Sequence, residues 1–437
     1  MKRSVTFSAP SSPLRLTLAG MGAIGVSFGF ARYGYGLFLP EFRAEFGLSV
    51  ALTGLIGSMS YAGYLVALLV VGGLVARFGP RPLVVTGGLC AAAGSAVVAF
   101  APGPLALTAG LVLAGSSPGW AWAPYSDAVD RLVQPAHRDR VMGAIATGTA
   151  FAVAVAGPLA LVARDTGWRA VWGVFAVLSA AVTVWNARVL PTGPHTARVS
   201  AGASPAANGA AHAGSSAAPG RPRTGLRWFL RLAALPLWLT AALYGLLGAV
   251  YWAFAVEAVS GAGEGPGSVV VPVFWTMMGL AGTAGVLTGH AIGRYGLRLV
   301  HTGLFTGMAA AVALLAAAPG ALPAVLASAV LYGPCFMAGS GLLAVWSHHV
   351  YPDQPSTGFS ATVLFLGLGT LAGPAGAGAF ADTYGLRTAL LATAVLGAVS
   401  LMTRPPRRTP ATGTPVADGP TEGPAEVPAE GPALNRL

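Results

Sequence analysis

A basic side chain, Arg32, interrupts the first long apolar run of the chain, in the segment FGFARYGYGLFLP. Charged residues within a membrane span are costly and usually mark a solute path or a buried ion pair. A guanidinium donates forked hydrogen bonds to carboxylate and phosphate oxygens. Because residues three apart share a helix face, Tyr35 is expected beside Arg32, where it can stack or hydrogen bond. We therefore expect Arg32 to bind the anionic group of a solute, unless it extends to the headgroups or holds a backbone carbonyl.

Carboxylates are rare within the apolar runs, and Asp127 and Glu257 each lie at the edge of one. Asp127 is placed near the short loop that carries Arg77 and Arg81, so we expect it to pair with one of them, with proton coupling as the alternative. Glu257 lies at the opposite edge of the membrane and is expected to be a solvated carboxylate. The alternatives for Glu257 are a gate against Arg32 or a proton carrier.

The other reactive residues exclude several kinds of site. The histidines are scattered over loops and helix ends without the spacing of metal ligands, so neither a metal nor a cofactor is expected. The nearest approach to a catalytic cluster is His348, His349 and Asp353, which is too sparse to indicate an enzyme. Cys90 and Cys335 both lie within apolar runs and are expected to be small core residues.

The composition shows what must position these residues. Hydrophobic residues make up 54% of the 437 residues and charged residues only 9%, and the mean hydropathy is +0.68. These values lie outside the range of soluble domains, and the 61 glycines favour closely packed helices over a β-barrel. The formal net charge of +11 does not indicate nucleic-acid binding, because the arginines stand between apolar runs rather than in a basic stripe.

The apolar runs predict how the chain crosses the membrane. A transmembrane helix needs about 20 residues, and the chain contains about twelve such runs in two groups, residues 14–190 and 228–403. Residues 191–227, rich in Pro, Ala, Gly and Ser, are expected to be a flexible linker, and residues 404–437 a disordered tail. Most arginines fall on the side of the membrane that holds residues 1–13, the linker and the tail. Both termini are therefore expected in the cytoplasm, with the protein in the inner membrane.

Four short loops resemble one another and read ARFGPR, ARDTGWR, GRYGLR and ADTYGLR. Their shared glycines are Gly79, Gly167, Gly296 and Gly385, and the separation within the first pair nearly equals that within the second. Each glycine follows the second span of a three-span unit, which indicates two halves built from repeated units. This pattern, over about residues 14–403, resembles that of the Major Facilitator Superfamily.

The most specific local mark of this resemblance is the loop motif G-x-x-x-D-R-x-G-x-R after the second span. In the family its acidic residue helps to latch the cytoplasmic ends of the two halves, whereas Ala76 stands there in this chain. The second half carries an echo of the same motif. The residues expected to form the latch are Gly72, Arg77, Gly79, Arg81, Asp127, Arg294, Gly296 and Arg298.

The resemblance implies an all-α integral membrane fold of about twelve transmembrane helices in two pseudo-symmetric six-helix bundles. In this family spans 1, 4, 7 and 10 line the central cavity. Aromatic residues on these spans suggest a moderately hydrophobic cavity around Arg32, although helix packing or interfacial belts explain some of them equally well. The residues expected to bind solute are Arg32, Tyr35, Trp120, Tyr244, Tyr251 and Trp346.

The function that the resemblance implies is secondary transport of a small organic solute by alternating access. The site favours an organic anion or an amphipathic metabolite, with export favoured over uptake. Protons are a candidate coupling ion, and the expected partners are the solute and the lipid bilayer, with no nucleic acid and no second subunit. A membrane-embedded enzyme and a non-transporting sensor are the alternatives.

Overall fold

The apolar runs fold into helices because a segment in lipid must satisfy its own backbone hydrogen bonds. The computed structural model describes residues 13–163, 165–193, 232–263, 269–352 and 354–405. Every regular element within these residues is helical, so the predicted all-α class is confirmed. The termini, most of the predicted linker and nearly all of the predicted tail lie outside the described residues, and their boundaries stay predictions.

Proline and serine mark several helix starts of the first half. Pro80 and Pro104 each open a helix, where a missing N–H costs nothing, and Ser49 accepts a hydrogen bond from the Leu52 amide at 3.1 Å. The elements of this half are α1 (Pro13–Ile24), the π-helix η1 (Gly25–Arg32), α2 (Gly34–Leu37), α3 (Leu39–Phe46), α4 (Val50–Phe78), α5 (Pro80–Ala99), α6 (Pro104–Ser116), η2 (Ser117–Trp120), α7 (Trp122–Leu132), η3 (Pro135–His137), α8 (Arg138–Ala146), α9 (Gly148–Val162) and α10 (Trp168–Val189).

The second half repeats this plan with fewer interruptions. Pro334 and Pro374 lie inside long helices, which membrane bundles tolerate because neighbouring groups satisfy the freed carbonyls. Its elements are η4 (Leu232–Ala234), α12 (Leu235–Ser260), α13 (Val270–Gly282), η5 (Thr283–Leu287), α14 (Thr288–Tyr295), α15 (Leu297–Ala317), α16 (Leu322–Val350), α17 (Pro355–Tyr384), α18 (Leu386–Val399) and η6 (Ser400–Met402).

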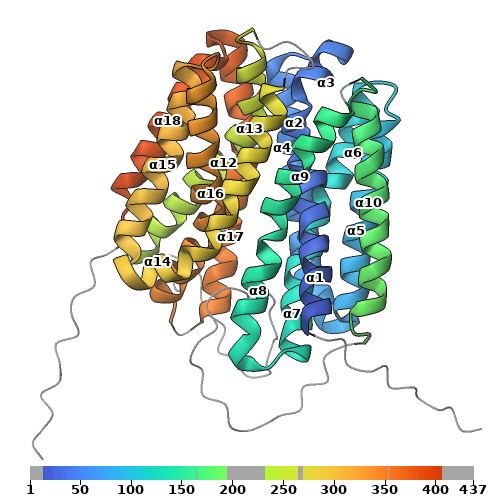
Figure 1. Cartoon of the computed structure of the whole chain (residues 1–437). Coiled ribbons are helices and arrows are strands. Elements are labelled where there is room, and N and C mark those ends of the chain that lie inside the picture. The colour runs from blue at the N-terminus through green and yellow to red at the C-terminus, as the bar shows by residue number, and fades with distance from the viewer. Residues whose placement is uncertain (1–12, 164, 194–231, 264–268, 353, 406–437) are drawn as a thin grey trace, which may run out of the picture. The chain divides into compact units, whose positions relative to one another are not determined.

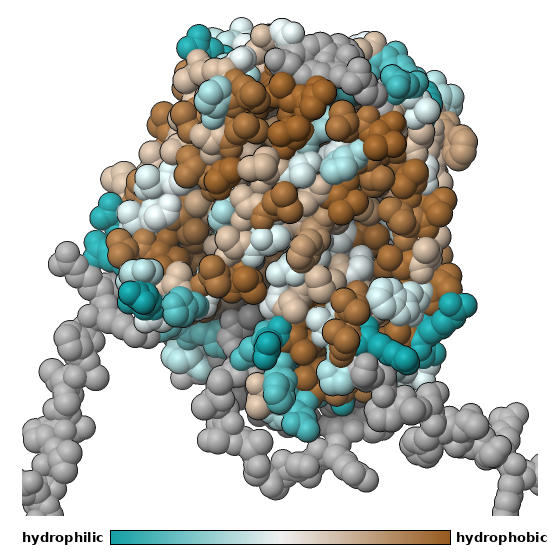
Figure 2. Space-filling view, in the orientation of Figure 1, coloured by the Kyte–Doolittle hydropathy of each residue, from teal (hydrophilic) through white to brown (hydrophobic). Residues whose placement is uncertain are grey.

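Ten helical segments of the described chain are long and apolar enough to cross a membrane. The other two predicted spans are present in altered form. The run from Pro104 to Leu132 is interrupted by the 3-10 turn η2, and α18 is a shorter apolar helix continued by η6. The structure is therefore consistent with about twelve spans. Figure 2 shows hydrophobic side chains over the face in view, with hydrophilic ones gathered toward its two ends.

The four loop glycines occupy equivalent junctions between helices. Gly79, Gly167, Gly296 and Gly385 have φ values of 77°, 81°, 79° and 83°, and each directly precedes the first residue of a helix. A side chain is strained at such angles, so glycine is required at each position. The repeated loop sequence thus encodes one backbone turn, used four times.

The two halves lie side by side, with residues 13–190 in blue to green and residues 235–403 in yellow-green to red (Figure 1). Two helix pairs join them, α4 against α17 and α9 against α13. Glycines bring the backbones together at these seams. A Cβ added at Gly54 would lie 2.2 Å from the Pro374 carbonyl oxygen, and one added at Gly157 would lie 2.4 Å from that of Pro272.

We name the two ends of the bundle by a residue at each. The Glu257 end holds α3 and the last turn of α12, and the Arg81 end holds the junction of α4 and α5. At the Glu257 end and in the middle of the bundle, Gly36 packs on the Trp252 backbone and Gly378 on that of Val50. At the Arg81 end, none of the residues of α14 is buried.

Candidate functional site

The first span changes to a π-helix over the eight residues that end at Arg32. Gly25 and Gly29 in η1 lie against α9, where a Cβ added at Gly29 would come within 2.3 Å of the Ala152 side chain. The Tyr33 amide donates to the Phe28 carbonyl at 3.0 Å and closes the wider turn. Such π-turns are frequent at functional sites. Here the turn ends at Arg32, whose residue surface is only 8% exposed.

Aromatic rings surround the Arg32 guanidinium. Its central carbon lies 4.2 Å from the ring centre of Tyr64, 4.4 Å from that of Tyr61 and 5.5 Å from that of Phe28. Cation–π attraction over several rings stabilises a charge that is removed from water. Nevertheless Arg32 Nε is buried without a hydrogen-bond acceptor, and no carboxylate among the described residues forms an ion pair with this arginine.

The second half supplies the next rings. Tyr33, whose ring centre is 5.9 Å from the Arg32 guanidinium carbon, stacks on Trp252 of α12 with centroids 4.0 Å apart. Phe336 of α16 meets Trp252 edge-on at 5.5 Å, and Tyr332 stacks on Phe336 at 5.4 Å. We call Tyr33, Trp252, Tyr332 and Phe336 the inter-half aromatic cluster, because it joins residues of both halves beside Arg32.

Two of the predicted binding residues lie directly behind this cluster. Tyr244 stacks on Phe336 at 5.3 Å, and its hydroxyl donates a hydrogen bond to the Phe336 carbonyl. Tyr251 stacks on Tyr332 at 3.7 Å, and its hydroxyl is hydrogen bonded to Ser328. Tyr244 and Tyr251 therefore support the rings nearest Arg32, and direct contact with a solute stays a prediction for both.

The other predicted binding residues lie elsewhere. Tyr35 donates to the Thr53 carbonyl at 2.6 Å, since the π-turn and the break after it rotate Tyr35 away from Arg32. Trp120 packs within the first half against Val71, Val75 and Leu83, and Trp346 packs edge-on against His301 at 5.6 Å.

The aromatic residues around Arg32 that were missed from the sequence are Tyr33, Tyr61, Tyr64, Trp252, Tyr332 and Phe336. The spacing of Tyr61 and Tyr64 places two hydroxylated rings on one face of an otherwise apolar helix, which is a signal that could have identified them.

The predicted latch residues lie at the Arg81 end. Asp127 forms an ion pair with Arg131 one turn along α7 at 2.6 Å, whereas Arg77 or Arg81 was the expected partner. Arg81 Nε donates to the Leu190 carbonyl at 2.7 Å and ties the α4–α5 junction to the end of α10. Gly72 has open space around it, and a latch between the halves stays a prediction.

The echo of the loop motif is arranged like the first copy. Arg294 lies over the ring of Tyr295 at 5.6 Å, as Arg77 lies over Phe78 at 5.5 Å. Gly296 forms the junction that follows, and Arg298 lies half-buried in the first turn of α15.

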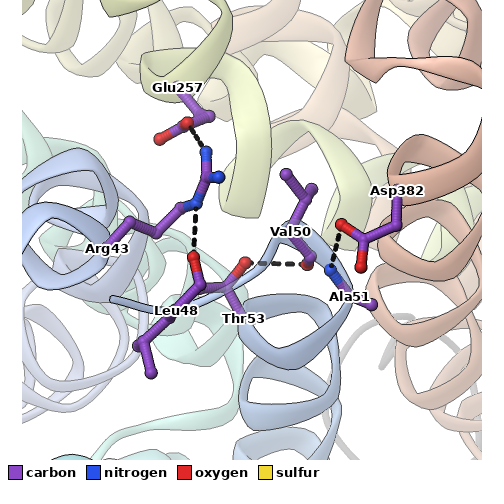
Figure 3. A network of polar contacts seen from close by, with 7 residues as sticks. All are labelled: Arg43, Leu48, Val50, Ala51, Thr53, Glu257 and Asp382. Carbon is purple, nitrogen blue, oxygen red and sulfur yellow. Dashed lines mark hydrogen bonds and ion pairs between the residues drawn. The ribbon is translucent and has the colours of Figure 1, made fainter. Parts of the chain in front are cut away.

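A polar network joins the halves at the Glu257 end (Figure 3). Arg43 of α3 forms an ion pair with Glu257 of α12, and its Nε donates to the Leu48 carbonyl at 3.1 Å. Asp382 of α17 accepts a hydrogen bond at 3.1 Å from the amide of Ala51, in the first turn of α4. A carboxylate is favourable at a helix N-terminus. Glu257 is thus the partner of Arg43, with 13% of its side chain exposed, whereas a solvated carboxylate was expected, with a gate against Arg32 or a proton carrier as the alternatives.

Glu41 makes the network sensitive to pH. Burial and, to a lesser extent, the negative charge of Glu257 raise the pKa of Glu41 to about 6, and its Oε2 is buried without a hydrogen-bond partner. The other titratable side chains that lie near Glu257 are Arg43 and Tyr35. In an arrangement with the halves apart at this end, we expect Glu41 to be solvated and to have its ordinary pKa of 4.5. The joined arrangement therefore holds the Glu41 proton more tightly and is favoured at low pH.

We expect the joined Glu257 end to lose about 2 kcal/mol of stability, relative to the separated one, as pH rises from 4.5 through 6. Spin labels at Phe100 and Val269, two exposed positions at this end in opposite halves, report the separation. The short-distance population should grow as pH falls from 7.5 to 5. Glu41→Gln should abolish this change, and an unaltered pH response in that variant would contradict the assignment.

The comparisons with known proteins agree with this geometry. A model of the Major Facilitator Superfamily matches residues 21–364. A search against curated protein sequences gave no match. The structure is similar to a bacterial homologue of the human lysosomal transporter Spinster, in an inward-facing and occupied conformation, with a TM-score of 0.68 at 14% identity over 91% of this chain and 96% of that one.

Two further solved structures are similar. A mutant of the nucleoside transporter NupG gives a TM-score of 0.67 at 12% identity, over 89% of this chain and 98% of that one. The Spinster homologue in an inward-facing and unoccupied conformation gives 0.65 at 15% identity, over 90% and 96%. At these identities the likeness concerns the fold.

Proposed function

This chain belongs to the Major Facilitator Superfamily, as the loop motif indicated, and on that premise we propose that it is a secondary transporter of a small organic anion or amphipathic metabolite. Alternating access exposes a central site between the halves to each side of the membrane in turn. Export is the direction that we propose, because an aromatic site suits amphipathic compounds. We also propose a monomer in the inner membrane with cytoplasmic termini.

The observation that carries this proposal is the state of Arg32. Its charge is buried among aromatic rings, its Nε has no acceptor, and the ion pairs of the described residues leave it without a carboxylate. A buried charge of this kind is costly unless it is paired. An anionic solute would supply both the opposite charge and the missing acceptor. Family membership and the transporter neighbours likewise favour transport over an enzymatic activity.

We further propose that the halves are closed at the Glu257 end and open toward the Arg81 end. The Arg43–Glu257 ion pair and the close packing of Gly36 and Gly54 support closure at the first. The absence of buried residues in α14 supports an open second end.

The test is to compare Arg32→Ala and Arg32→Lys in purified protein against a panel of small carboxylates, followed by thermal shift. Arg32→Ala should weaken binding roughly ten- to hundredfold, since a hydrogen bond to a charged group contributes about 1.5–3 kcal/mol. Arg32→Lys keeps the charge but loses the forked geometry and should bind weakly. Arg387→Ala, at an exposed arginine, is the control and should bind normally.

Expression and melting temperature are measured on the same preparations. Normal folding with normal binding in Arg32→Ala would eliminate Arg32 as the anion site. A strongly lowered melting temperature in Arg32→Ala, partly restored in Arg32→Lys, would instead show that Arg32 is a structural tie.

A further inference from the structure

Trp252 is the residue of the second half that lies next to the Arg32 site, and its ring is held in place by its neighbours. Its ring is 2% exposed and is held edge-on by Phe336 at 5.5 Å, Trp275 at 5.4 Å and Tyr332 at 5.7 Å. One face of the ring is covered by Tyr33, which comes from the other half and is nearly parallel to it, at 15°. When the halves move apart, this stack between Tyr33 and Trp252 has to open.

The unpaired polar atoms at this place are donors. Trp252 Nε1 and Arg32 Nε are both buried without hydrogen-bond partners, and they come from opposite halves. An indole N–H and a guanidinium can donate but cannot accept. A ligand that binds between them must therefore bring acceptor atoms for Arg32 and no competing cation.

The distance from Arg32 to the stacking position on Trp252 restricts the shape of that ligand. The Arg32 guanidinium carbon is 5.9 Å from the centre of the Tyr33 ring that covers Trp252. A carboxylate attached directly to a planar ring spans this separation when it hydrogen bonds to the guanidinium. A ring in place of Tyr33 would stack nearly parallel to Trp252, as Tyr33 does with centroids 4.0 Å apart.

We infer that the solute is a planar aromatic acid, whose carboxylate binds Arg32 and whose ring stacks on Trp252 in place of Tyr33. This inference rests on the proposed function and deepens it by naming the class of solute. It makes Trp252 a specificity-determining residue, which distinguishes flat rings from saturated ones. The opening of the Tyr33–Trp252 stack would then be the step that lets the solute contact Arg32 of the first half and Trp252 of the second.

The test compares benzoate with cyclohexanecarboxylate, which carry the same charge on a flat and a puckered ring. The wild-type protein should bind benzoate about tenfold more tightly, since aromatic stacking contributes that order of preference. Trp252→Leu should remove this preference and leave the affinity for cyclohexanecarboxylate within about twofold. Trp252→Phe should retain part of it and serves as the second variant if Trp252→Leu does not fold. Trp185→Leu, at a tryptophan that is 39% exposed on α10, is the matched control and should keep the wild-type preference.

The outcomes separate this inference from the proposed function. Equal affinity of the wild-type protein for the two acids would overturn the aromatic class while leaving an anion transporter. An equal loss of both acids in Trp252→Leu and Trp252→Phe would show that Trp252 only supports the fold. Failure of benzoate to bind the wild-type protein would overturn the inference; failure of the whole carboxylate panel would overturn the proposed function as well.

Discussion

Gly54→Val is expected to prevent the Glu257 end from closing and to reduce transport by more than tenfold. A Cβ at Gly54 would lie 2.2 Å from the Pro374 carbonyl oxygen and 3.1 Å from the Gly378 Cα, both in the backbone of α17. Backbone atoms cannot turn aside as a flexible side chain can, so the halves must move apart. The cost falls on the joined arrangement alone, because α4 and α17 belong to different halves.

The control is the same substitution on the same helix. Gly73→Val lies in the last quarter of α4, where an added Cβ meets nothing within 4 Å. Both variants change helix propensity alike, so a difference between them reports the contact with α17. The Phe100 and Val269 spin labels should show a longer distance in Gly54→Val and an unchanged one in Gly73→Val. Equal distances in the two variants would show that the α4–α17 seam does not limit closure.

The second large effect is expected at the Arg43–Glu257 ion pair. Glu257→Arg replaces attraction between the halves by repulsion, and the side chains are mostly buried, with 28% and 13% exposure. A hydrogen bond to a charged group contributes about 1.5–3 kcal/mol, so the ratio of joined to separated molecules should fall roughly ten- to hundredfold or more. The label pair at Phe100 and Val269 measures that ratio.

A charge swap tests whether the pair itself is responsible. Arg43→Glu combined with Glu257→Arg should restore much of the joined population, because the double change re-forms an ion pair of opposite polarity. The control is the Glu45–Arg169 pair, which has an N···O distance of 2.6 Å and lies entirely within the first half. Arg169→Glu should leave the distance between the halves unchanged. If it widened the Glu257 end as much as Glu257→Arg does, a general loss of stability would be the better explanation.

The sequence predicted the fold better than the site, for a physical reason. Span length and the four junction glycines depend on local properties, namely apolar burial and a backbone angle that favours glycine, and the structure bears both out. Arg32 could be singled out in the same way, since a charge within an apolar run is visible without knowing its neighbours.

The partners of Arg32 depend on helix rotation, which local pattern does not determine. Tyr35 shares a face with Arg32 on an ideal α-helix, but the π-turn from Gly25 to Arg32 changes that register. Tyr61 and Trp252 reach the site from other helices, and only the packing of both halves decides which of many aromatic rings meet there. Glu41 was overlooked for the same reason, because its pKa is raised mainly by burial and to a lesser extent by Glu257, and both depend on the packing of the two halves.

The glycine contacts along the two seams have a consequence for the speed of the transport cycle. Where Gly54 meets Pro374, main chain rests on main chain, whereas at Gly157 the Thr276 hydroxyl lies beside the Pro272 carbonyl at the contact. Separation at the Gly54–Pro374 contact requires no change of rotamer, and rejoining there requires no search among alternative side-chain packings. We therefore expect the glycine contacts to add little to the energy barrier between the joined and separated arrangements. Most of that barrier should come from breaking the ion pairs and the Tyr33–Trp252 stack.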